Sequence, residues 1–131
     1  MDQIFEGVHC TVAVRCVQPN VLLVQIRGRD IGEHGEQPME ALASLLPATG
    51  KVELFIDARE ALGPSTEVSA GWAVWLAQHR HAFSHINMLT GSKFVQLTAA
   101  FVRKWADLNQ TMRIYTDATA FETALSLAQS D

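Results

Sequence analysis

The sequence has few of the residues that disulfide frameworks and structural metal sites require. It contains two cysteines, Cys10 and Cys16, and neither lies in a metal-binding motif. On one straight strand they would lie roughly 20 Å apart, which is too far for a disulfide. We therefore expect two free thiols in a reducing compartment and no metal site.

Basic clusters and long apolar runs are also missing. Lysine and arginine number 10 against 14 acidic residues, and the formal net charge is −4. Arg27 and Arg29 lie close together, but Asp30 follows them at once, so we expect no nucleic-acid binding. No apolar run approaches the length of a membrane span, and the N-terminus lacks a signal segment. We expect a cytoplasmic protein with no membrane insertion.

Motifs that would indicate catalysis are absent as well. There is no Gly-x-Ser-x-Gly sequence, and the turn 91–93 (Gly-Ser-Lys) lacks the spacing of a phosphate-binding loop. His79, His81 and His85 lie near the end of a predicted helix with no cysteine or carboxylate close in sequence. The sequence therefore predicts no catalytic residues, no cofactor and no enzyme.

The remaining composition is that of one globular domain spanning residues 1–131. Apolar residues make up 48% of the chain and charged residues 18%. Apolar patterning predicts strands at 9–17, 21–26, 51–57, 86–89 and 112–115, and helices beginning near Pro38, Thr66, Ser92 and Thr119. The order β-β-α-β-α-β-α-β-α predicts an α/β fold with a mixed, mostly parallel five-stranded sheet and four helices.

The two longest predicted helices carry apolar stripes that we expect to face the core. The first stripe comprises Val68, Trp72, Trp75, Leu76, His79 and Phe83, and the second Phe94, Leu97, Phe101, Trp105 and Leu108. The tryptophans allow the alternative of an apolar ligand pocket. Small residues on the first helix, Ala70, Ala73 and Ala77, permit another helix to approach closely, either within the fold or across a homodimer.

Candidate binding residues gather between the third strand and the helix after it. Asp57 ends the predicted strand, and open α/β sheets bind ligands beyond such ends. Arg59 follows it in a polar loop, 58–65. The alternative is structural, with Asp57 holding the loop through backbone N–H groups.

The start of the next helix supplies hydroxyl groups. Ser65 and Thr66 are placed to cap it. Ser69 is less needed for capping, and a phosphate on it would lie near the positive end of the helix dipole. Ser69 is therefore the candidate for phosphorylation.

A family resemblance rests on the element order, on the strand 52–57 (Val-Glu-Leu-Phe-Ile-Asp) and on the segment 68–72 (Val-Ser-Ala-Gly-Trp). In these features the chain resembles the STAS domain, the fold of bacterial anti-sigma-factor antagonists. The segment lies where that family has Asp-Ser-Ser-Gly-Leu, and the resemblance makes Ser69 the counterpart of the serine that is phosphorylated. Val68 and Ala70 depart from the motif, and the chain is more similar to a divergent STAS-like or SEC14-like branch.

Two hypotheses follow for the function. The first is a non-enzymatic regulatory domain that binds a protein partner through residues 57–69. The second is a carrier or sensor of a small apolar ligand or lipid, with its pocket near the tryptophans. The residues that we expect to bind the partner or ligand are Asp57, Arg59, Ser65, Thr66, Ser69 and Trp72.

Overall fold

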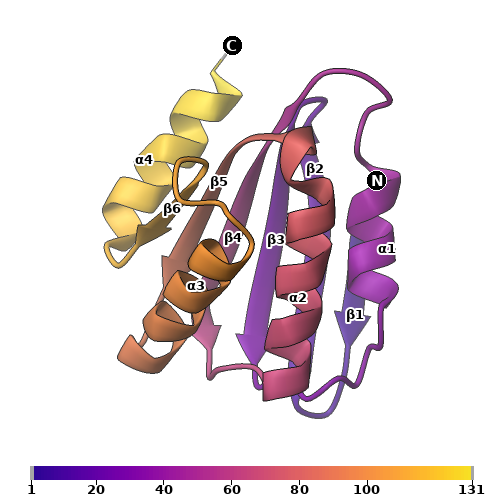
Figure 1. Cartoon of the computed structure of the whole chain (residues 1–131), viewed down its shortest axis with the longest axis vertical. Coiled ribbons are helices and arrows are strands. Elements are labelled where there is room, and N and C mark those ends of the chain that lie inside the picture. The colour runs from indigo at the N-terminus through magenta and orange to yellow at the C-terminus, as the bar shows by residue number, and fades with distance from the viewer. Residues whose placement is uncertain (1, 131) are drawn as a thin grey trace.

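The computed structural model describes residues 2–130, which form one six-stranded sheet with helices on both of its faces (Figure 1). The strands are β1 (Gln3–Glu6), β2 (Cys10–Gln18), β3 (Val21–Gly28), β4 (Val52–Ala61), β5 (Phe83–Thr90) and β6 (Met112–Tyr115). The helices are α1 (Gln37–Ser44), α2 (Thr66–His79), α3 (Lys93–Trp105) and α4 (Ala118–Gln129), and a short 3₁₀ turn, η1 (Arg80–Ala82), follows α2.

The strands lie in the sheet in the order of the sequence. The pairs β1–β2 and β2–β3 are antiparallel, and β3–β4, β4–β5 and β5–β6 are parallel. The α/β class, the mixed character of the sheet and the four helices are confirmed, but the prediction of five mostly parallel strands is wrong, because the sheet has six strands. Strand β1 escaped prediction because it is a four-residue edge strand in which only Phe5 is partly buried, so it lacks a clear alternation.

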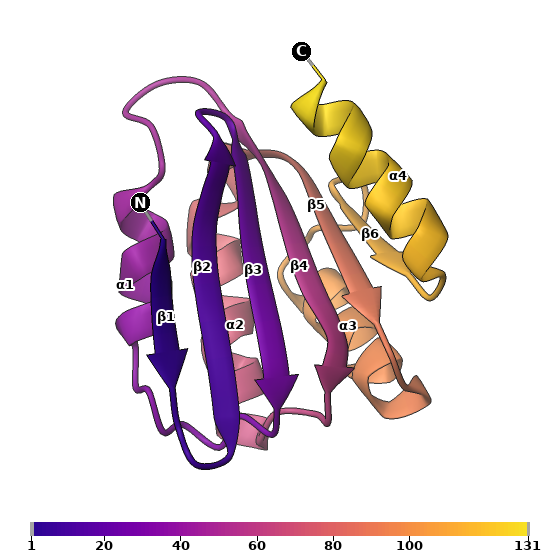
Figure 2. The same cartoon turned by 180° about the vertical axis from the view of Figure 1, so that it is seen from behind.

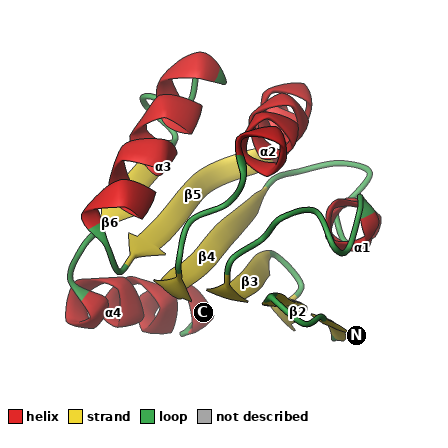
Figure 3. Cartoon of the chain, turned by 90° about the horizontal axis from the view of Figure 1, so that it is seen from below, coloured by secondary structure: helices red, strands yellow, loops and turns green. Residues whose placement is uncertain are grey.

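The helices divide into two layers. Helices α1, α2 and α3 cover one face of the sheet, and α4 alone lies on the other (Figures 2 and 3). The main core fills the space beneath the first layer and includes Leu22, Leu54, Trp75, Phe83 and Ile86. A smaller core beneath α4 includes Leu23, Phe55, Leu89 and Phe121.

Strand β4 runs four residues beyond its predicted end at Asp57. Ala58 and Ala61 are buried against Val95 of α3, and this contact continues the strand to Ala61. The polar pair Arg59 and Glu60 concealed this continuation in the sequence. The predicted loop 58–65 is therefore wrong in its first half, and Asp57 lies within a strand.

Helix α3 buries a different stripe from the one predicted. Val95, Ala99 and Val102 face the sheet. Of the predicted stripe, Leu108, which lies beyond the end of the helix, is buried, and the other four residues point to solvent: Phe94, Leu97, Phe101 and Trp105. Helix α2 does bury Trp75 and Leu76 as expected.

Both cysteines lie on β2 and are free, as predicted. Burial, followed by the nearby charges of Asp30 and Glu33, raises the pKa of the Cys10 thiol to about 12. Cys10 is therefore protonated near neutral pH and packs as a small apolar side chain.

Candidate functional site

The start of α2 is built around a capping serine. The Ser65 hydroxyl oxygen accepts the backbone N–H of Val68 at 3.2 Å, and the Ser65 N–H donates to the Asp30 carbonyl at 2.9 Å. These bonds fix the loop 62–65 between β4 and the helix. The prediction that Ser65 or Thr66 caps α2 is thus confirmed for Ser65.

Ser69 lies one turn inside the helix and is not the capping residue. Its backbone N–H already donates to the Ser65 carbonyl at 3.0 Å. Its side chain is partly buried, whereas Thr66 is exposed. Ser69, Thr66 and the half-buried Trp72 therefore lie on the same stretch of α2, as the sequence predicted.

An apolar cavity of about 80 Å³ lies between the sheet, α2 and α3. Ser69 and Trp72 form part of its wall, and the other lining side chains are almost all aliphatic, among them Ile56, Val68, Met88 and Val95. The sequence suggested a pocket near the tryptophans, and the cavity adjoins Trp72 of α2. Trp105 is not among its lining residues.

A second depression of about 210 Å³ adjoins this cavity, between residues 30–39 and α2. The two hollows share Asp30, Val68 and Trp72. The charged residues that line them are Asp30, Glu36 and Glu67, all of them acidic. Asp30, Glu36 and Glu67 thus form an acidic rim of the two hollows, of which Ser69 lines only the first.

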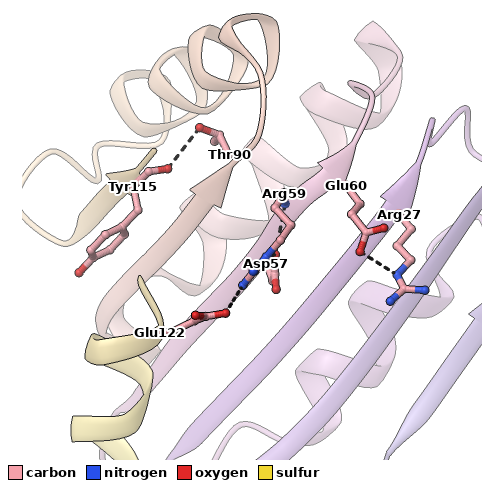
Figure 4. A network of polar contacts seen from close by, with 7 residues as sticks. All are labelled: Arg27, Asp57, Arg59, Glu60, Thr90, Tyr115 and Glu122. Carbon is pink, nitrogen blue, oxygen red and sulfur yellow. Dashed lines mark hydrogen bonds and ion pairs between the residues drawn. The ribbon is translucent and has the colours of Figure 1, made fainter. Parts of the chain in front are cut away.

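Asp57 and Arg59 lie on the opposite face of the sheet, toward α4. Arg59 donates from Nε to Asp57 Oδ1 at 3.0 Å and from a terminal nitrogen to Glu122 of α4 at 3.0 Å (Figure 4). These two hydrogen bonds raise the pKa of the Arg59 guanidinium. The Asp57 carboxylate also accepts the backbone N–H of Arg59 at 3.2 Å. The pair connects β4 to α4, which is a structural role.

The sheet thus separates the six residues that we placed on one working face. Ser65, Thr66, Ser69 and Trp72 stay together, and Asp57 and Arg59 are divided from them by β4 itself. The reason is the strand extension: side chains along β4 alternate between faces, and Asp57 and Arg59 both point toward α4.

The sequence reading missed the outward face of α3. The signal was present, because the helix carries two apolar stripes, one of large residues and one of small ones. The small stripe, which includes Ala99 and Val102, allows α3 to approach the sheet closely. The large stripe is left outside.

Residues 2–130 contain neither a metal-binding group nor a membrane-spanning helix. No three histidine, cysteine or acidic side chains in this part of the chain come together as a metal-binding group. None of its helices has the length and apolar character that crossing a bilayer requires.

No family model and no curated protein matches the sequence. Solved structures that resemble the fold include the following two. A DUF3478-family protein from Shewanella loihica PV-4, described as having a SpoIIAA-like fold, aligns with a TM-score of 0.66 at 15% identity, covering 94% of this chain and 99% of that one. The anti-sigma factor antagonist SpoIIAA in its unphosphorylated form aligns with a TM-score of 0.58 at 12% identity, covering 88% and 96%. The chain therefore has the SpoIIAA-like fold, which is the STAS fold that the sequence pattern predicted.

Proposed function

We propose that this protein is a non-enzymatic regulatory domain that binds a protein partner through the start of α2. The observation that carries the proposal is the position of Ser69: its hydroxyl is not used as a helix cap, and it lines an apolar hollow together with Trp72. The structural likeness to an anti-sigma factor antagonist supports this class of function. The binding residues of the proposal are Ser65, Thr66, Ser69 and Trp72.

A charge on Ser69 would change this surface strongly. Asp30 lines the same cavity as Ser69, and Glu36 and Glu67 line the depression that adjoins it. A partner that covers the hollow must remove water from any charged group at its mouth, which is costly when no cation pairs with that group. Phosphorylation of Ser69 would therefore act by weakening the contact.

The test is the substitution Ser69→Asp, after partners have been isolated by co-purification and identified. We expect Ser69→Asp to weaken binding of the purified partner by about tenfold or more, which corresponds to about 1.4 kcal/mol. Ser126→Asp makes the same chemical change at an exposed site on α4 and should leave binding unchanged. Thermal unfolding monitored by circular dichroism checks that both variants keep the fold. Equal affinities for all three proteins, with cross-links mapping the partner to the α4 face, would refute the proposal.

A second candidate function is the binding of a small apolar ligand, favoured by the cavity between α2 and α3. Its aliphatic lining suits an alkyl or aromatic group, and the acidic rim disfavours an anionic head group. We expect the neutral dye N-phenyl-1-naphthylamine to fluoresce when mixed with the protein. Ala99→Leu, which places extra volume at the cavity wall, should reduce that signal by at least about half. A signal that survives this change but disappears in Phe101→Gln would show that the dye binds to the exposed face of α3, against this candidate.

A further inference from the structure

Helix α3 presents a stripe of large apolar side chains to solvent. Phe94, Leu97, Phe101 and Trp105 are 57%, 59%, 61% and 55% exposed. Single exposed apolar residues are ordinary on a protein surface, but four on one helix face form a patch of the kind that marks an interaction site. We call these four residues the α3 ridge.

The ridge is continuous with the loop that leads into α2. From Phe94 to Trp105 it extends over about three helical turns, or roughly 17 Å. At its N-terminal end the ring of Phe94 lies directly on Gly63, where a Cβ atom would come within 2.5 Å of the ring. The neighbouring Leu62 is 62% exposed. The ridge therefore borders the partner-binding surface that we propose on α2.

The charge of α3 is opposite in sign to that of the whole chain. The helix carries Lys93, Arg103 and Lys104 and no acidic residue, whereas the chain has a formal net charge of −4. Lys93 and Lys104 are separated by about three turns, so both lie along the same edge of the ridge. An apolar stripe with a basic edge is complementary to an apolar surface with acidic flanks.

Three kinds of occupant could cover the ridge: a second copy of the chain, a lipid bilayer or a helix of a protein partner. The charge pattern and the width of the ridge decide between them. In a second copy of the chain, packing α3 against α3 would bring lysines together with no carboxylate on either helix. An anionic bilayer is broader than the ridge, so it would meet not only the lysines but also the net-negative rest of the chain, including Asp107, exposed just beyond the ridge. A narrow ridge of about three turns instead has the dimensions of one face of a single helix.

We propose that the α3 ridge docks an acidic amphipathic helix of a protein partner. Its apolar stripe covers the four ridge side chains, and its flanking carboxylates pair with Lys93 and Lys104. Aromatic residues at the centre of such a contact supply most of the binding energy, which assigns the largest share to Phe101. The inference rests on the proposed function and names the kind of partner that the domain would bind.

The test uses two synthetic helical peptides that share a leucine stripe and differ in their flanking charges. One carries glutamate at every flanking position and the other carries lysine. We expect the acidic peptide to bind about tenfold more tightly or better at low salt, by fluorescence anisotropy, and this preference to shrink as salt is added. Equal binding of the two peptides, or binding of neither, would overturn the proposal.

Matched variants locate the contact. Phe101→Gln should weaken binding of the acidic peptide by about tenfold or more. Leu127→Gln removes an equally exposed apolar side chain (66% exposed) from α4 and should leave the affinity unchanged. Lys104→Gln should cause a smaller loss and lower the salt dependence. A Phe101→Gln variant that binds like the wild type would show that the ridge is not the docking surface.

Three further outcomes distinguish a membrane or a second copy as the occupant of the ridge, and separate failure of the ridge proposal from failure of the proposed function. The occupant would be a membrane if the protein sedimented with phosphatidylglycerol vesicles, lost this binding when ridge residues were replaced, and failed to bind the acidic peptide. A dimer in analytical ultracentrifugation that Phe101→Gln dissociates would replace the partner helix with a second copy. If Ser69→Asp weakens the binding of a native partner and Phe101→Gln does not, the ridge proposal is overturned and the proposed function stands.

Discussion

Replacing Trp75 with alanine lowers the free energy of unfolding by about 3–5 kcal/mol, the usual cost of truncating a buried aromatic side chain. The indole is 8% exposed and packs between the rings of Trp72, His79 and Phe83. Its centroid lies 4.2 Å from that of His79 in a stacked arrangement. The truncation removes all of these contacts and leaves a hole that the sheet and α2 cannot close.

Trp105→Ala is the matched control for this prediction. The sequence placed both tryptophans in the core, but Trp105 is 55% exposed at the end of α3. Its removal should change the free energy of unfolding by no more than about 1 kcal/mol. Urea unfolding followed by far-ultraviolet circular dichroism measures both variants independently of tryptophan fluorescence. Similar losses for Trp75→Ala and Trp105→Ala would mean that α3 is rotated from the orientation described above.

The contrast between these tryptophans shows what the sequence pattern can predict and what it cannot. Spacing alone identifies α3 as a helix, but it cannot choose between two stripes that are both apolar. The choice depends on how closely the helix approaches the sheet, and alanines allow a closer approach than phenylalanines. A side chain such as Phe101 is left outside for this reason, and a rule that buries the largest residues fails here.

The candidate site was predictable to the extent that it depends on local structure. Ser65, Thr66, Ser69 and Trp72 lie on one short helical stretch, so their proximity follows from helix geometry. The position of Asp57 relative to them depends on where a strand ends. That end is set by tertiary contacts, because Ala58 and Ala61 pack on Val95 of α3.

The position of the loop before α2 depends on Gly28, a glycine far away in sequence. We expect the second large effect on stability from replacing this residue. Gly28 ends β3 with φ of +83°, and its carbonyl accepts the N–H of Leu62 at 2.9 Å. A Cβ atom at this position would lie 2.2 Å from the carbonyl oxygen of His9. Alanine at position 28 therefore combines a left-handed backbone with a collision against main chain, which cannot move aside as a flexible side chain would.

We expect Gly28→Ala to lower the free energy of unfolding by about 2–5 kcal/mol, the sum of left-handed strain and overpacking. Gly50→Ala is the control, because Gly50 has φ of +86° but no atom near its would-be Cβ, so that only the strain of about 1–2 kcal/mol remains. Urea midpoints of the two variants measure the difference. A Gly28→Ala variant no less stable than Gly50→Ala would show that β2 and β3 separate easily at this end. In that case the hydrogen bond from Leu62 would not hold the loop against the sheet, and the start of α2 would lose the rigid support that the binding surface proposed there requires.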